Sequence, residues 1–153
     1  MENENLSYPQ AEILGLVSNT AAGKEVFNTH CIQCHQMDML GIQIGPNLTH
    51  ISSKLDKSGL YEAIVYPNSS IVFGYEAFNI EMKDENRYYG FLLSENENNL
   101  TIKDLAGKQI VLKKSEVKSK VNETKSLMPA AKSLNISPQE LADLLAYLSA
   151  SKI

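Results

Sequence analysis

The sequence lacks any apolar run near the ~20 residues that a membrane span requires. It also lacks an excess of basic residues: 14 Lys and Arg stand against 18 Asp and Glu, for a formal net charge of −4. Nucleic-acid binding usually needs a clustered basic surface, which is absent here. We therefore expect a chain with no membrane span and no nucleic-acid partner, whose mild acidity is that of an ordinary solvated surface.

The first ten residues, MENENLSYPQ, lack the basic start and apolar stretch of a secretory signal. The chain is therefore expected to be either cytoplasmic or a segment that lacks its export signal. Residues 1–10 are polar, and we expect them to form a disordered lead-in. With 153 residues and 43% hydrophobic content, the chain can form one domain with an inserted module, which we place at residues 11–153.

Cysteine is scarce: the chain has only Cys31 and Cys34, and His35 follows directly. A zinc site would need more ligands, and His30 and His50 could complete only an irregular cluster. A thioredoxin-like pair would need a βαβ context, and a structural disulfide would leave the adjacent histidine unexplained. Covalent attachment of one haem c explains all three residues, because two thiols add across the haem vinyl groups and the imidazole binds the iron.

Apolar spacing predicts helices on both sides of this motif. A helical signal over residues 11–30 leads into the motif, with Thr20 in position to act as an N-cap. A short helix over residues 54–66 is ended by Pro67. The C-terminal helix starts with a capping-box pattern and has one apolar face; the residues concerned are Ser137, Pro138, Gln139, Glu140, Leu141, Leu144, Leu145 and Leu148.

Between residues 75 and 117 the apolar period is close to two. Four strand-like runs, at about 78–82, 88–93, 100–102 and 110–112, are separated by polar turns. We expect a four-stranded antiparallel meander that is too poor in apolar residues to fold alone and packs on the helices. Residues 118–127 are polar and are expected to form a loop. The predicted fold class is therefore mainly α, with this β meander inserted.

A haem that transfers electrons has two strong axial ligands, and a methionine opposite a histidine raises the reduction potential. Of the five methionines, four are poorly placed: Met1 in the polar tail, Met37 and Met39 just after His35, and Met82 in an expected strand. Met128 remains, in a loop stiffened by Pro129 just before the C-terminal helix. We predict that Met128 is the second axial ligand, opposite His35.

Two further histidines could bind the iron, and one proline could hold the axial imidazole. His30 and His50 are most simply surface or loop residues, but ligation by His50 would lower the potential and is the main chemical alternative. An axial imidazole usually donates its other N–H to a fixed acceptor. The Gly45-Pro46 loop offers a backbone carbonyl for this purpose, and we assign the role to Pro46.

Together these motifs resemble the class I cytochrome c family. The residues that carry the resemblance are Gly23, Phe27, Cys31, Cys34, His35, Gly45, Pro46, Asn47, Leu48, Met128, Pro129, Leu144 and Tyr147. The resemblance implies that Gly23 and Phe27 pack against the last helix, with Tyr147 as the aromatic partner. His35 and Met128 are 93 positions apart. The simplest members of the family need much less, and the surplus is the strand-rich segment between the attachment motif and the methionine loop.

Three segments resemble a subgroup, the haem-binding domain often found at the C-terminus of large, modular, dehydrogenase-like bacterial proteins. They are GPNLT at 45–49, PNSSIVFGY at 67–75 and SLMP at 126–129. The resemblance implies export to the periplasm, because haem c is attached outside the bacterial cytoplasm. It also implies that residues 1–10 are a linker remnant, and that a monomeric domain relays electrons from a dehydrogenase to a downstream acceptor.

The expected function is one-electron transfer by a mono-haem c-type cytochrome, which is an electron carrier and not an enzyme. The alternative is a haem-based gas sensor or ligand-binding module, in which a small gas displaces Met128. A peroxidase usually needs a second haem, or an open iron with distal acid–base groups, and the chain has a single attachment motif.

Overall fold

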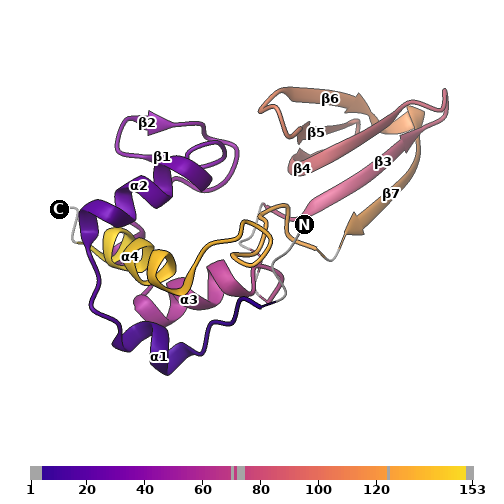
Figure 1. The fold of residues 1–153 in the computed structure, drawn as a ribbon. Helices are drawn as coiled ribbons and strands as arrows, with labels where there is room; N and C mark the ends of the chain where they lie inside the picture. Colours follow the sequence, from indigo (N-terminus) through magenta and orange to yellow (C-terminus); the bar gives the residue numbers. More distant parts are fainter. Residues whose placement is uncertain (1–4, 70, 72–74, 124, 151–153) are drawn as a thin grey trace. The chain divides into compact units, whose positions relative to one another are not determined.

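The chain forms two compact units, one inserted into the other in sequence. The computed structural model describes residues 5–69, 71, 75–123 and 125–150. The first unit is built from Met1–Ser69 and Met128–Ile153, and the second is Ser70–Leu127 (Figure 1). Met1, which the sequence analysis set aside, lies outside the described residues.

The first unit is helical. It contains the α-helices α1 (Gln10–Gly15), α2 (Thr20–His30), α3 (Lys57–Val65) and α4 (Pro138–Ser149), and the 3₁₀ helix η1 (Ile51–Ser53). A small antiparallel hairpin, β1 (Gln36–Met37) and β2 (Leu40–Gly41), follows the Cys-x-x-Cys-His motif. Among the described residues, no helix has the length and apolar character needed to cross a membrane.

Side-chain caps mark the starts of α2, α3 and α4. The predicted capping box of α4 is confirmed: Ser137 accepts from the Glu140 N–H, and Glu140 accepts from the Ser137 N–H. The predicted cap of α2 is wrong by one residue. Asn19 is the N-cap, because its side-chain oxygen accepts from the Ala22 N–H at 2.9 Å, and Thr20 is the first helical residue.

Helices α2 and α4 pack closely where α2 carries a glycine. A Cβ on Gly23 would lie 1.9 Å from the Asp143 carbonyl oxygen and 2.8 Å from the Tyr147 Cβ. One turn further along α2, the rings of Phe27 and Tyr147 are tilted with centroids 5.7 Å apart. The packing of Gly23 and Phe27 against the last helix is therefore confirmed.

A buried carboxylate joins the same two helices. Asp143 is 7% exposed, and its Oδ1 accepts from the Asn19 N–H at 2.8 Å and from the Gln139 amide at 3.0 Å. The Gln139 amide also donates to the Val17 carbonyl at 2.8 Å. A negative charge at the N-terminus of α2 is favourable, because the first N–H groups of a helix have no partners within it.

The residues just before α1 also pack on the helices. Tyr8 is 8% exposed and belongs to the core of the first unit, although the polar sequence around it predicted a disordered lead-in over residues 1–10. Residues 1–4 of that lead-in lie outside the described residues.

The second unit is a five-stranded antiparallel sheet. Its strands are β3 (Ala77–Met82), β4 (Arg87–Glu95), β5 (Asn99–Lys103), β6 (Gln109–Lys113) and β7 (Val117–Glu123), in the order β6-β5-β4-β3-β7. The loop predicted over residues 118–127 is wrong for its first part, because β7 pairs with β3 from Ala77 to Met82. No residue of β7 is fully buried, so this edge strand shows little of the apolar pattern that reveals inner strands.

The fold class predicted from the sequence is wrong. Helix makes up 31% of the structure and strand 26%, so the chain is mixed α and β and not mainly α. The error arose because four strands were expected in the insertion, whereas it forms five strands and a further short hairpin follows the motif.

The sheet must be strongly curled, because its edge strands are consecutive in the chain. In a flat five-stranded sheet the two edges would lie about 19 Å apart, at ~4.8 Å per strand. The connection from β6 to β7 is the three-residue 3₁₀ helix η2 (Lys114–Glu116), which advances only about 2 Å per residue. Curling brings the two edges near each other and encloses a core of its own; this cluster is Ile80, Met82, Leu100, Ile102 and Leu112.

The substitution Gly23→Ala tests the α2–α4 packing. Its Cβ would clash with the backbone of α4, which cannot move aside as a side-chain tip can. We expect the free energy of unfolding to fall by about 2–3 kcal/mol in denaturant titrations. Gly15→Ala is the matched control, because its Cβ would meet nothing within 4 Å, and it should stay within about 0.5 kcal/mol of wild type. Equal stabilities of the two variants would contradict the close packing.

Candidate haem site

The Cys-x-x-Cys-His motif forms a tight turn at the end of α2. Cys31 is the C-cap residue, and its carbonyl accepts from the Cys34 N–H at 3.1 Å and the His35 N–H at 2.9 Å. The helical turn therefore continues past the cap and places both thiols and the imidazole on one short segment. Cys31 is half-buried, Cys34 is exposed and His35 is only 8% exposed.

The imidazole of His35 is held by a backbone carbonyl. Its Nδ1 lies 2.7 Å from the carbonyl oxygen of Pro46, the contact that the sequence analysis expected from this proline. A carbonyl can only accept, so Nδ1 carries the proton and donates. This tautomer leaves the lone pair of Nε2 as the one able to bind a metal.

Two glycines leave room for His35, Gly45 beside its ring and Gly41 beside its backbone carbonyl. A Cβ on Gly45 would lie 2.8 Å from Cε1 and 3.1 Å from Nδ1 of His35. Gly41 has φ +101°, and a Cβ there would lie 2.2 Å from the His35 carbonyl oxygen. The roles of both glycines were not predicted from the sequence; the only signal for Gly45 was its position directly before Pro46.

Burial controls the ionisation of the motif. It lowers the pKa of His35, against the opposing effect of the hydrogen bond to Pro46, so the imidazole is neutral and able to ligate near pH 7. Burial, and then the nearby Cys34, raises the pKa of the Cys31 thiol to about 12.

The four methionines that the structure describes lie in different environments. Met37 is 2% exposed in the core of the first unit, and Met82 is 5% exposed in the core of the sheet. Met39 is 89% exposed at the tip of the β1–β2 hairpin. Met128 lies in the loop before α4 and packs, partly buried, against the helical core.

The other histidines lie at the ends of elements. His30 is the last residue of α2, and His50 is the exposed N-cap residue of η1. Within the part of the chain that the structure describes, no three His, Cys, Asp or Glu side chains are grouped so as to hold a metal ion, which gives the zinc alternative no support. The two thiols are not joined to each other.

Comparison with known proteins gives a consistent result. The cytochrome c family matches residues 20–107, which is more than half of the chain. This match includes the Cys-x-x-Cys-His motif and Pro46 and extends through the first three strands of the sheet, β3 to β5. It ends in the turn before β6, and so before Met128. A cytochrome c from Gossypium barbadense is 28% identical over 137 residues, which cover 87% of this chain and 90% of that protein.

The substitution Gly45→Ala tests the room left for the imidazole. The added methyl group would push the His35 ring and weaken its hydrogen bond to Pro46. We expect a loss of about 1–3 kcal/mol of stability and faster solvent exchange of the ring N–H in proton NMR. Gly59→Ala in α3 is the control, because its Cβ would meet only side-chain atoms of Leu55 and Asp56, at 3.2 Å or more. A ring N–H that exchanges at the same rate in both variants would argue against this packing.

Proposed function

The chain belongs to the cytochrome c family, and from this premise we propose that it is a mono-haem one-electron carrier with His35 and Met128 as axial ligands. Its cofactor is one covalently bound haem c with iron, as membership of the family implies. We propose that Cys31 and Cys34 form the two thioether bonds. The haem supplies the redox chemistry: its iron gains and loses a single electron.

The observation that carries this proposal is the setting of His35. The ring is neutral, buried and fixed by Pro46, on the same turn as two thiols at attachment spacing. The hydrogen bond that Nδ1–H donates to Pro46 orients the ring and makes Nε2 a stronger electron-pair donor to the iron. A disulfide or an isolated thiol pair would not require an adjacent histidine held in this way.

Met128 is proposed as the sixth ligand on different grounds. Met37 and Met82 are buried in separate cores, and Met39 is 89% exposed at a hairpin tip. Met128 is partly buried and is followed by Pro129, which restricts the loop. A soft thioether stabilises reduced iron and raises the potential, as an electron carrier of this kind requires.

Two ligands that close both axial positions favour a carrier over a catalyst. We propose that residues 11–153 act as one cytochrome c domain with the sheet as an insertion, and that the redox partners are a dehydrogenase donor and a downstream acceptor. The sequence likeness to the haem-binding domain of modular bacterial proteins supports this arrangement. It also supports export to the periplasm, where haem c attachment takes place.

The variant Met128→Ala tests the ligand assignment. The protein is expressed with haem-attachment machinery, and spectra are recorded in both oxidation states. We expect oxidised wild type to show the weak near-infrared sulfur-to-iron band and the variant to lose it, with a lower reduction potential because the thioether no longer stabilises reduced iron. Met39→Ala is the matched control and should keep both the band and the potential, because its side chain is 89% exposed.

Two other results would contradict parts of the proposal. A haem spectrum without the sulfur band in wild type would exclude Met128, and His50→Ala would then show whether histidine replaces it. Binding of carbon monoxide to reduced wild type at neutral pH would indicate a displaceable ligand and favour a gas sensor over a carrier. Absence of covalent haem would overturn the whole assignment.

A further inference from the structure

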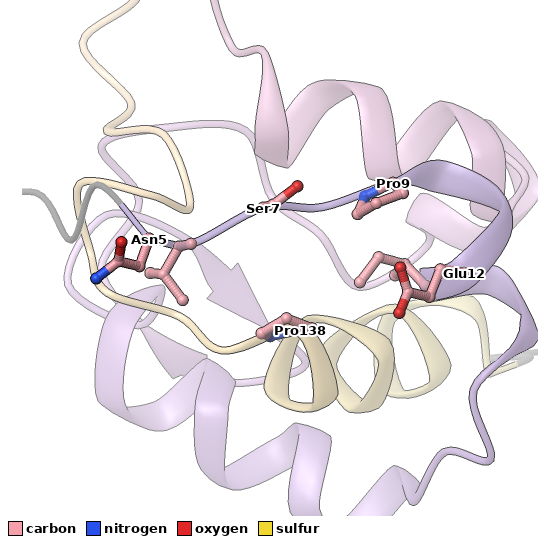
Figure 2. Close-up of a pocket in the computed structure, with 7 residues that line it drawn as sticks. Asn5, Ser7, Pro9, Glu12 and Pro138 are labelled. Atoms are coloured by element: carbon pink, nitrogen blue, oxygen red, sulfur yellow. The ribbon is translucent and has the colours of Figure 1, made fainter.

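The segment before α1 forms a strap across the helical unit. We call residues 5–9 the N-terminal strap; its residues Ser7 and Pro9 lie across a small pocket from Pro138, the first residue of α4 (Figure 2). The pocket is lined by Asn5, Leu6, Ser7, Pro9, Glu12, Ile13 and Pro138. The strap packs on the helical core through the buried side chain of Tyr8 and the partly buried side chain of Leu6.

Two tyrosine hydroxyls tie the strap in place. The Tyr8 hydroxyl donates to the carbonyl of Ile136 at 2.5 Å, across 128 positions of sequence. The Tyr61 hydroxyl, from α3, donates to the backbone carbonyl of Tyr8. Through Tyr8, the strap therefore connects α3 to Ile136, near the end of the loop before α4.

That loop is the one that carries Met128. Its segment 131–136 is a compact turn, in which the Ile136 N–H donates to the Ala131 carbonyl at 3.2 Å. Ala131 is 0% exposed and Ile136 is 1% exposed. The Ala131 N–H donates to the Ile64 carbonyl at 3.0 Å, so α3 holds the near end of the turn directly. Through Tyr61 and Tyr8, α3 also holds the far end.

We propose that Tyr8 and Tyr61 are positioning residues that clamp the Met128 loop and limit how readily Met128 leaves the iron. This inference rests on the proposed function, in which Met128 is an axial ligand. Met128 stands three residues before Ala131, so an opening of the turn 131–136 would carry Met128 with it. The turn can move as a unit only if two hydrogen bonds break, the one from the Ala131 N–H to Ile64 and the one from the Tyr8 hydroxyl to Ile136.

The physical basis is the cost of an unpaired buried carbonyl. Without the Tyr8 hydroxyl, the carbonyl of Ile136 stays buried in the closed loop with no replacement donor, whereas water can reach it in an open loop. Losing the hydroxyl therefore destabilises the closed loop more than the open one. Burial raises the pKa of both Tyr8 and Tyr61, so both hydroxyls remain protonated donors at neutral pH.

The test uses the oxidised holoprotein with imidazole as the added ligand. Loss of the sulfur-to-iron band is followed as imidazole is titrated into wild type, Tyr8→Phe and Tyr61→Phe. We expect both variants to lose the band at about five- to tenfold lower imidazole concentration, as expected for one lost hydrogen bond. Amide hydrogen exchange in residues 128–137 should rise by a similar factor, and this readout does not involve the haem.

Two controls separate positioning from general stability. Asn19→Ala removes the cap of α2 and destabilises the unit without touching the loop. It should leave the imidazole midpoint unchanged and raise exchange evenly across the helical unit, not selectively in residues 128–137. Tyr89→Phe, in the separate sheet unit, is the chemically matched control and should change neither the midpoint nor the exchange of residues 128–137.

The double variant Tyr8→Phe/Tyr61→Phe tests whether the two tyrosines act as one clamp. Because each lost hydroxyl releases the same strap, the combined shift should be smaller than the product of the single shifts. Unchanged imidazole midpoints and unchanged exchange in Tyr8→Phe would overturn the inference. If wild type lacks the sulfur-to-iron band, the ligand assignment fails by itself, and exchange in residues 128–137 still decides whether the clamp exists.

Discussion

The close approach of α2 and α4 at Gly23 is the constraint on which the site depends. Helix α2 ends in the turn that carries Cys31, Cys34 and His35, and α4 follows directly after the Met128 loop. The two proposed axial ligands are 93 positions apart in sequence, yet both belong to segments anchored on this pair of helices. Only a glycine permits the approach, because any side chain at that position would meet the backbone of α4.

A large insertion between the two ligand segments is compatible with this constraint, because it folds around a core of its own. The sheet encloses a cluster of five buried apolar residues, and the short connection η2 joins its two edge strands. A disordered loop of that length would add closure entropy to the helical unit, although this cost grows only slowly with length. Because the insertion folds around its own core, the packing of α2 against α4 is determined by the helical unit alone.

Local motifs were readable from the residues alone, whereas contacts between distant segments were not. The capping box of α4 and the carbonyl of Pro46 follow short patterns within one stretch of chain, and the structure contains both. The packing of Gly23 and Phe27 against α4 joins distant segments, and only the resemblance to the cytochrome c family indicated it. Strand β7 was missed because it has no buried apolar residues to mark it, and it is a strand only through its pairing with β3. The N-cap of α2 was misplaced by one residue because Asn19 and Thr20 are both good cap residues.

The same distinction explains why the anchoring of the strap and the roles of Gly41 and Gly45 were not foreseen. Tyr8 stands in a polar stretch, and its partner Ile136 is 128 positions away, so no local pattern marks the pair. A glycine in a loop is usually a sign of a turn, and only the position of the His35 ring shows that a methyl group at Gly45 would collide with it.

The anchoring of the Met128 loop bears on the choice between an electron carrier and a gas sensor. A sensor needs a ligand that leaves easily, which requires a loop with few attachments and a low cost of local opening. The loop after Met128 has the opposite character: Ala131 and Ile136 are fully or almost fully buried, and α3 holds the turn at both ends. A carrier gains from this arrangement, because a ligand that stays on the iron in both oxidation states leaves little structure to rearrange when the electron moves. If Met128 binds the iron as proposed, this architecture favours its retention, and with it the transfer of an electron over the capture of a gas.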